Sequence, residues 1–212
     1  MKLARDRCAV LLVDLQRAFC DDRGSMAAHG RDIGRLRRAV YVSHRLAGAA
    51  RKAGVPVAWT RMAFAPDYAD AGLLVRELRP DFARIGALRA DTPDVELAAG
   101  ADRDEDEPIF DRTRFSALVG THLEDWLRAA AIDTVVVAGV TTSLAVESTV
   151  RDLAQRDFKV FVVREACADF DDAAHEAAFA AMAAGFARVV GEGDVTAAWF
   201  ARGGRDFPRP GT

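Results

Sequence analysis

The stretch DTVVVAGVTTSLAVEST, residues 133–149, places a short apolar run directly before a segment with helical spacing. Its first part, up to Gly139, is β-branched or apolar without polar alternation, which is typical of a strand buried on both faces. After it, Val146, Val150 and Leu153 recur at the spacing of an apolar helix face. The stretch therefore predicts a buried strand followed at once by a helix over 143–157.

The same alternation of apolar runs and helical segments continues along the chain. Continuous apolar strands that alternate with helices are typical of a parallel sheet covered on both faces. We predict one three-layer α-β-α domain of the α/β class over residues 1–202, with a six-stranded, mostly parallel sheet and a loose polar tail at 203–212. The expected strands are 8–14, 55–60, 107–112, 133–139, 158–163 and 186–191, and the expected helices are 33–54, 119–131, 143–157, 171–185 and 194–202.

Composition limits the classes of function. The 212 residues include 29 Lys and Arg against 32 Asp and Glu, a formal net charge of -3, which disfavours nucleic acid as a partner. The apolar run near the N-terminus is too short to span a bilayer and lacks a signal-peptide cleavage site. The cysteines, Cys8, Cys20 and Cys167, are too scattered for a disulfide framework or a metal site. We expect a cytoplasmic protein that acts on a small molecule and contacts neither membrane nor nucleic acid.

Candidate site residues follow the predicted strands, because ligands of parallel sheets bind beyond the carboxyl ends of the strands. Asp14 ends the first strand, and Arg112 ends the third. The helix after the fourth strand presents its N-terminal N–H groups, which favour an anion or a developing oxyanion. Ala145, in the first turn of this helix, is the position best placed to carry a nucleophile, yet it holds only a methyl group.

Four motifs carry a resemblance to a known family: VDLQRAF (13–19), RTRFSAL (112–118), GVTTSLAVEST (139–149) and EACADFDDAAHEAA (165–178). From about residue 8 to residue 190, the chain resembles the isochorismatase-like hydrolases, also called cysteine hydrolases. The resemblance implies a catalytic triad of Asp, Lys and Cys, whose positions here hold Asp14, Arg112 and Ala145. It also implies a cis peptide between Val140 and Thr141. Substrate contacts are expected from the segments after the strands, at Gln16, Phe19, Phe115, Thr141, Thr142 and Leu144.

Each replacement in the triad has a chemical consequence. Ala145 cannot attack a carbonyl, so the covalent acyl-enzyme route of the family's amidases is closed. Arg112 keeps the positive charge, but it cannot give up its proton, and its planar fork suits a carboxylate. Burial at the end of a strand raises the pKa of Asp14, whereas a nearby arginine lowers it. The nicotinamidase-like members bind a metal through an Asp-x-His pair after the second strand, where this chain has WTRMAF (59–64). We therefore expect no metal and no cofactor.

Three interpretations of Ala145 stay open. In the first, the chain hydrolyses a small anionic metabolite without a thiol, as isochorismatases cleave a vinyl ether by protonation from the Asp and addition of water. In the second, it is an amidohydrolase whose cysteine was replaced by alanine. In the third, it is a non-catalytic binder or structural subunit. The replacement of both Cys and Lys favours the first and third, because engineering usually changes one residue.

Assembly is the last expectation. The resembling family is commonly oligomeric, and the segment DVTAAWFARGG (194–204) is rich in apolar residues near the C-terminus. We predict a homo-oligomer, in which this segment contributes surface to a partner chain.

Overall fold

The computed structural model describes residues 1–208, and six parallel strands form its main sheet. The order across the sheet is β4-β3-β2-β5-β6-β7, and all five neighbouring pairs are parallel. The predicted fold class is thus confirmed, with every expected strand present. The strands are β2 (Cys8–Val13), β3 (Val57–Met62), β4 (Ile109–Arg112), β5 (Thr134–Val140), β6 (Lys159–Ala168) and β7 (Arg188–Val190).

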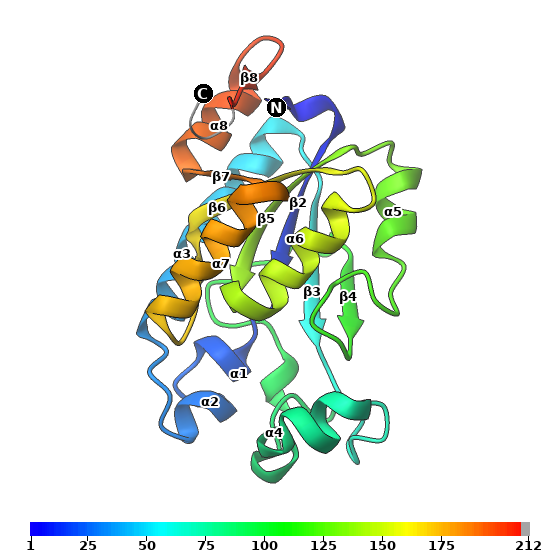
Figure 1. Cartoon of the computed structure of the whole chain (residues 1–212), viewed down its shortest axis with the longest axis vertical. Coiled ribbons are helices and arrows are strands. Elements are labelled where there is room, and N and C mark those ends of the chain that lie inside the picture. Colours follow the sequence, from blue (N-terminus) through cyan, green and yellow to red (C-terminus); the bar gives the residue numbers. More distant parts are fainter. Residues whose placement is uncertain (209–212) are drawn as a thin grey trace.

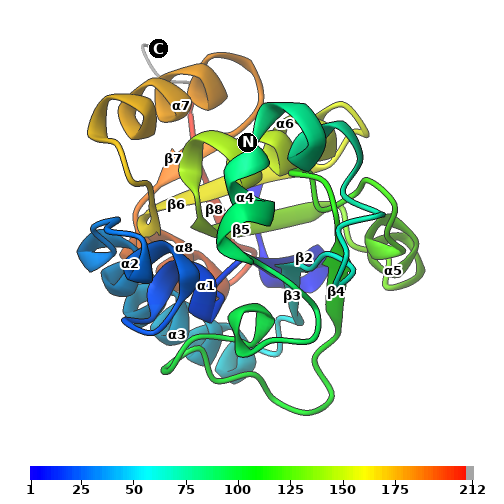
Figure 2. The same ribbon diagram turned by 90° about the horizontal axis from the view of Figure 1, so that it is seen from below.

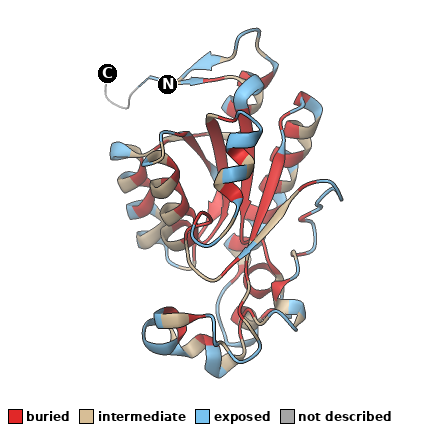
Figure 3. Cartoon of the chain, turned by 90° about the vertical axis from the view of Figure 1, so that its right-hand side faces the viewer, coloured by how far each residue is buried: buried red, intermediate tan, exposed pale blue. Residues whose placement is uncertain are grey.

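Helices cover both faces of the sheet (Figure 1). On one face lie α3 (Gly34–Ala53) and α8 (Glu192–Phe200), and on the other lie α5 (Leu123–Ala129), α6 (Glu147–Ala154) and α7 (Asp172–Gly185). Alternate strand residues serve the two cores: Val10 and Leu12 pack under α3, whereas Leu11 and Val13 pack under the opposite layer. The central strands β2 and β5 are therefore buried at every residue, as the red strands inside the sheet show (Figure 3), whereas the edge strands β4 and β7 are only partly buried.

The chain reverses its direction of progress across the sheet between β2 and β5. From β2 it proceeds to β3 and β4 on one side, and it then returns to build β5, β6 and β7 on the other. Ligands of open α/β sheets bind at such a switch point, beyond the carboxyl ends of the two central strands. Asp14 follows β2 and Thr141 follows β5, so the topology brings these residues to one place.

Short helices cover this end of the sheet, as seen from below in Figure 2. Because they are four to six residues long, they carry no periodic pattern, and the sequence predicted only turns and loops around short elements for 61–107. They are α1 (Arg17–Cys20), α2 (Ser25–Ala28), the π-helix η2 (Leu74–Leu78) and α4 (Pro80–Ile85). Two 3-10 turns, η1 (Arg5–Arg7) and η3 (Pro93–Val95), complete the connections.

Most strand boundaries differ from the prediction by one or two residues, and two differences are larger. β6 continues to Ala168, because a register shift between Val137 and Gly139 of β5 lets the strand resume pairing at Cys167. At the C-terminus, Arg205–Asp206 forms β8, which pairs antiparallel with β1 (Lys2–Leu3), so this part of the predicted tail is not loose. The rest of that tail, 209–212, lies outside the described residues. Among the described helices, none is long and apolar enough to cross a membrane.

Candidate active site

Asp14 and Arg112 form a buried ion pair at the switch point. Arg112 Nη2 donates to Asp14 Oδ2 at 2.7 Å, and the two side chains are 0% and 2% exposed, respectively. Asp14 has a positive φ of 52°, a conformation that is uncommon outside glycine and concentrates at functional sites. The backbone thus turns sharply out of β2 and places the carboxyl group beside the end of β4.

Burial dominates the acidity of Asp14. Loss of hydration raises the pKa of this carboxyl above its ordinary value, and the charge and hydrogen bond of Arg112 offset only part of that rise. The carboxyl is satisfied on one side only, because Oδ1 has no hydrogen-bond partner among the described residues. A carboxyl with a raised pKa and one unengaged oxygen is suited to hold and donate a proton.

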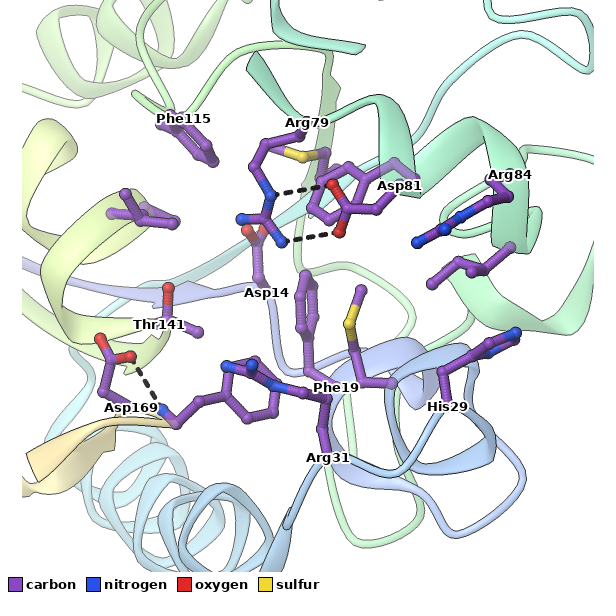
Figure 4. Close-up of a pocket in the computed structure, with 17 residues that line it drawn as sticks. Asp14, Phe19, His29, Arg31, Arg79, Asp81, Arg84, Phe115, Thr141 and Asp169 are labelled. Carbon is purple, nitrogen blue, oxygen red and sulfur yellow. Dashed lines mark hydrogen bonds and ion pairs between the residues drawn. The ribbon is translucent and has the colours of Figure 1, made fainter.

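A cavity of about 330 Å³ opens in front of this carboxyl group (Figure 4). Ala145 lies in its wall and is 2% exposed, in the continuous helical segment formed by the π-helix η4 (Thr142–Val146) and α6. The Val140–Thr141 peptide that leads into this segment is cis, as the resemblance implied. Asp14, Thr141 and Ala145 therefore line one space, with the methyl group of Ala145 at the position expected for a nucleophile.

The helix N-terminus at Ala145 already has an anionic partner. Asp169, which follows β6, accepts hydrogen bonds from the backbone N–H of Ser143 at 2.7 Å and from its hydroxyl at 2.8 Å. Its other oxygen accepts from the N–H of Phe170 at 2.8 Å. The first turn of the helix is thus capped by a carboxylate that is distant in the sequence but in direct contact with it. The sequence had assigned this end of the helix to an incoming anion.

The six expected substrate contacts divide into two groups. Four of them line the cavity: Phe19, Phe115, Thr141 and Leu144.

The other two, Gln16 and Thr142, are fully buried, and their side chains form hydrogen bonds within the protein instead of lining the cavity. The Gln16 amide donates to Met62 O at 2.9 Å and to Val95 O at 3.3 Å, and it accepts from Met62 N–H at 2.9 Å. Thr142 Oγ1 shares a 2.8 Å hydrogen bond with His175 Nδ1.

Arg112 also differs from its expected role as a partner for a substrate carboxylate. Its side chain lies behind Asp14 and is not in the cavity wall. Besides Asp14, it binds the carbonyl of Arg114, through Nη1 at 2.9 Å. The carboxylate for which the arginine fork is suited is thus that of Asp14, because the site is too buried for a second anion to reach the guanidinium.

Most of the remaining wall comes from segments that the sequence left without a role. They contribute a set of apolar and charged side chains, in which arginine is the commonest charged residue: Met26, His29, Arg31, Met62, Arg79, Asp81, Phe82, Arg84, Ile85 and Phe170. Arg79 forms a two-pronged ion pair with Asp81, at 3.2 and 3.1 Å. The clustering of arginines in RELRPDFAR (76–84) was the one available signal, but a charged run in a loop is more often a solvated surface.

The cysteines do not supply the missing thiol. None of Cys8, Cys20 and Cys167 lines the cavity, and all three are buried. Burial raises the pKa of Cys167 to about 12, so its thiol stays protonated and unreactive near neutral pH. Over residues 1–208, no group of three or more His, Cys, Asp or Glu side chains is placed to hold a metal ion.

The fold and the site define a class of protein: a parallel sheet between two layers of helices, with a buried carboxyl group at the switch point and a helix N-terminus opposite. Residues 8–193 match the isochorismatase domain, so the chain belongs to the isochorismatase family.

Individual relatives agree with this assignment. The chain is 29% identical over 173 residues to the ureidoacrylate amidohydrolase RutB of Methylorubrum extorquens, a match that covers 76% of this chain and 69% of that protein. The structure of a cysteine hydrolase from Pseudomonas syringae pv. phaseolicola superposes with a TM-score of 0.84 at 28% identity, covering 93% and 94% of the two chains. N-carbamoylsarcosine amidase from Thermoplasma acidophilum shares the fold, with a TM-score of 0.70, 21% identity and coverage of 88% and 96%.

Proposed function

We propose that this chain hydrolyses a small anionic metabolite without a cysteine nucleophile, with Asp14 as the general acid. The observation that supports it best is that a buried carboxyl with a raised pKa lies at a cavity whose wall contains no thiol. Retention of Asp14 together with loss of the nucleophile favours proton-driven chemistry over acyl transfer. Arg112 supports the acid, because it stabilises the carboxylate that remains after the proton has left.

An enol ether is the substrate type that needs only these groups. Asp14 donates its proton to the terminal carbon of the double bond, whose π electrons form the new C–H bond. Positive charge then develops on the carbon that bears the ether oxygen, and water adds to that carbon. The proton lost by the water returns to Asp14, and the resulting hemiketal breaks into an alcohol and a ketone. Water and substrate are thus consumed in equal amounts, and the acid is regenerated.

The small side chain of Ala145 fits this scheme. A methyl group in the wall leaves more room beside the reacting carbon than a thiol would, and it cannot capture the cationic intermediate. Amide hydrolysis, the activity named for the relative from Methylorubrum extorquens, would require another nucleophile here. The cavity wall holds no cysteine, serine or lysine side chain to provide one.

Turnover of a panel of enol ethers, amides and ureido acids tests the proposal. The unmodified protein should cleave an enol ether, and Asp14→Asn should lower kcat by about 10²–10⁴-fold, because the amide keeps the shape but has no acidic proton. Ala145→Cys should not improve enol ether cleavage. If the unmodified protein cleaves none of the compounds, and Asp14→Asn binds ligand as well as the unmodified protein does, the chain is a binder. If only Ala145→Cys is active, on amides, the chain is an amidohydrolase that lost its cysteine.

A further inference from the structure

The cavity wall carries positive charge that no carboxylate of the described chain neutralises. Arg79, in the wall, is paired with Asp81 at 3.2 and 3.1 Å, and Arg112, behind the wall, is paired with Asp14 at 2.7 Å. Arg31, in the loop between α2 and α3, has no carboxylate within ion-pair distance in the described chain, and its guanidinium donates no hydrogen bond there. A guanidinium carries five N–H donors, so this group has unused capacity for an acceptor.

The guanidinium of Arg31 is nevertheless held in place. It lies over the ring of Phe170, 4.5 Å from the ring centroid, and both residues line the cavity. Figure 4 shows Arg31 among the residues of the wall. Stacking on an aromatic face fixes the plane of the guanidinium and leaves its edge free to donate. The backbone of Phe170 is in turn held by Asp169, which accepts from the N–H of Phe170 at 2.8 Å. An arginine stacked in this way loses less rotamer freedom when it binds a carboxylate.

The position of Arg31 gives the cavity a direction. Asp14 is 1% exposed at the inner end, whereas Arg31 belongs to the exposed residues at the rim. Between them the wall is mainly apolar, with Phe19, Met62 and Leu144 among its residues. A ligand with an anionic end and an apolar, unsaturated body would therefore place its anion at the rim and its other end beside the buried acid.

We propose that Arg31, positioned by Phe170, is the carboxylate-binding residue of this site, and that the substrate is a small unsaturated monocarboxylic acid bound with its carboxylate at the rim. Two parts of this proposal rest on the proposed function: that the substrate is unsaturated, and that the bond to be cleaved faces Asp14. Arg84 of α4 also lines the cavity and has no carboxylate within ion-pair distance in the described chain, but it is not stacked on a ring. It adds positive charge without a fixed orientation.

Binding of cinnamate, compared with that of the neutral cinnamamide, measures the inference without any turnover. Calorimetric titration of the full chain at low ionic strength should show cinnamate bound about tenfold more tightly than the amide. Arg31→Gln should reduce this preference to about twofold or less, and Phe170→Leu, which keeps an apolar side chain but removes the ring, should reduce it partly. Arg84→Gln should cost about two- to threefold, because an exposed and unfixed cation contributes little.

Arg76→Gln is the matched control, since Arg76 lies on η2 outside the cavity wall and is paired with Glu77. It should leave the preference unchanged. The inference is overturned if the unmodified protein does not discriminate cinnamate from cinnamamide, or if Arg31→Gln and Arg76→Gln behave alike. Asp14→Asn should retain the preference. A retained preference without turnover of any compound would contradict the proposed function alone, whereas turnover without the preference would contradict this inference alone.

Discussion

Asp14 Oδ2 accepts a 2.7 Å hydrogen bond from Arg112 Nη2, and the two residues come from strands that are not neighbours in the sheet. Asp14 follows β2 and Arg112 ends β4, with β3 between them, so the pair spans the carboxyl end of the intervening strand. The resemblance placed a catalytic acid and a cation at these positions. The structure adds that the cation is directed at the acid itself and is buried behind it.

Arg112→Met tests the cost of leaving Asp14 without its cation. Methionine replaces much of the volume, but the buried carboxylate then lacks a partner, so the free energy of unfolding should fall by about 3–5 kcal/mol near neutral pH. Arg61→Met is the control, because Arg61 forms a more exposed pair with Asp111 at 2.7 Å in the same part of the sheet. Its loss should cost less than about 1 kcal/mol in urea titrations.

The same variant should show a distinct pH dependence. Burial raises the folded-state pKa of Asp14 above the unfolded value of 3.8, and removal of Arg112 should raise it further. A carboxyl with a raised folded pKa contributes stability that is present below 3.8 and is lost as the pH rises through the folded pKa. The difference in the free energy of unfolding between the unmodified protein and Arg112→Met should therefore be smallest at acidic pH and grow toward neutral pH. A difference that is constant with pH would contradict this account of the pair.

Thr60 should help to set the acidity of Asp14. Thr60 Oγ1 and Asp14 Oδ1 are both buried, and neither atom has a hydrogen-bond partner among residues 1–208. The Thr60 hydroxyl acts to lower the pKa of Asp14, and the two backbones are joined by a 3.1 Å hydrogen bond from Asp14 N to Thr60 O. Thr60→Val should raise the pKa of Asp14 further, whereas Thr60→Ser should not. Carbon-13 NMR titration of the Asp14 carboxyl measures both, and equal pKa values in the two variants would remove Thr60 from this role.

Gln16 should matter for folding rather than for ligand affinity. Its amide joins the backbones of Met62 and Val95 inside the protein, so Gln16→Ala leaves these groups without partners. We expect a loss of about 2–4 kcal/mol in the free energy of unfolding. Gln155→Ala, at an exposed helix end, should cost less than about 0.5 kcal/mol. A Gln16→Ala protein of unchanged stability that binds cinnamate more weakly would restore Gln16 as a ligand contact.

The sheet could be predicted from the sequence because its signal is local. The central strands are short apolar runs, and the helical segment that contains α6 is long enough to show a repeating apolar face. Asp14, Arg112 and Ala145 could be placed together because each follows a strand whose end must meet the others at one edge. The fold and the central part of the site thus depend on patterns that are read within about fifteen residues.

The rest of the site depends on contacts between distant segments. The α4 helix is six residues long, so no periodicity reveals it, and its Arg79 and Arg84 resemble an ordinary solvated loop in the sequence. Asp169 caps a helix by binding Ser143, which lies 26 residues before it in the sequence. Gln16 looked like a site residue because it lies next to the strand end, yet its amide turns toward Met62 in the framework. Sequence position gave the location of these residues but not the direction of their side chains.

The homo-oligomer stays a prediction, and fewer exposed apolar residues support it than the sequence suggested. Of the C-terminal segment expected to contact a partner, Val195, Ala198 and Trp199 pack in the chain's own core, while Phe200 is 59% exposed. Tyr41, Leu73, Leu78 and Val119 are further exposed apolar residues. We predict a homo-oligomer by light scattering at micromolar concentration, with Phe200→Ser shifting the mass toward the monomer. A monomeric unmodified protein would contradict the prediction.

Gly139 should be essential to the geometry of the switch point. It pairs with Val13 across the two central strands and has a φ of 131°, which side chains rarely adopt. A Cβ added here would overlap the carbonyl oxygen of Val13, the residue directly before Asp14. Either the two strands separate or the chain fails to fold, so Gly139→Ala should lower the free energy of unfolding by about 4 kcal/mol or more.

Two other glycines separate the causes of that loss. Gly54 has a φ of 72° but open space around an added Cβ, so Gly54→Ala reports the backbone conformation alone, at about 1 kcal/mol. Gly185, at the end of α7, has neither constraint, and Gly185→Ala should be neutral or stabilising by up to about 1 kcal/mol. Urea denaturation of the three variants gives the comparison. If Gly139→Ala costs no more than Gly54→Ala, the close approach of β5 to Val13 does not set the position of Asp14, and the acid must be held in place by Arg112 and Thr60 alone.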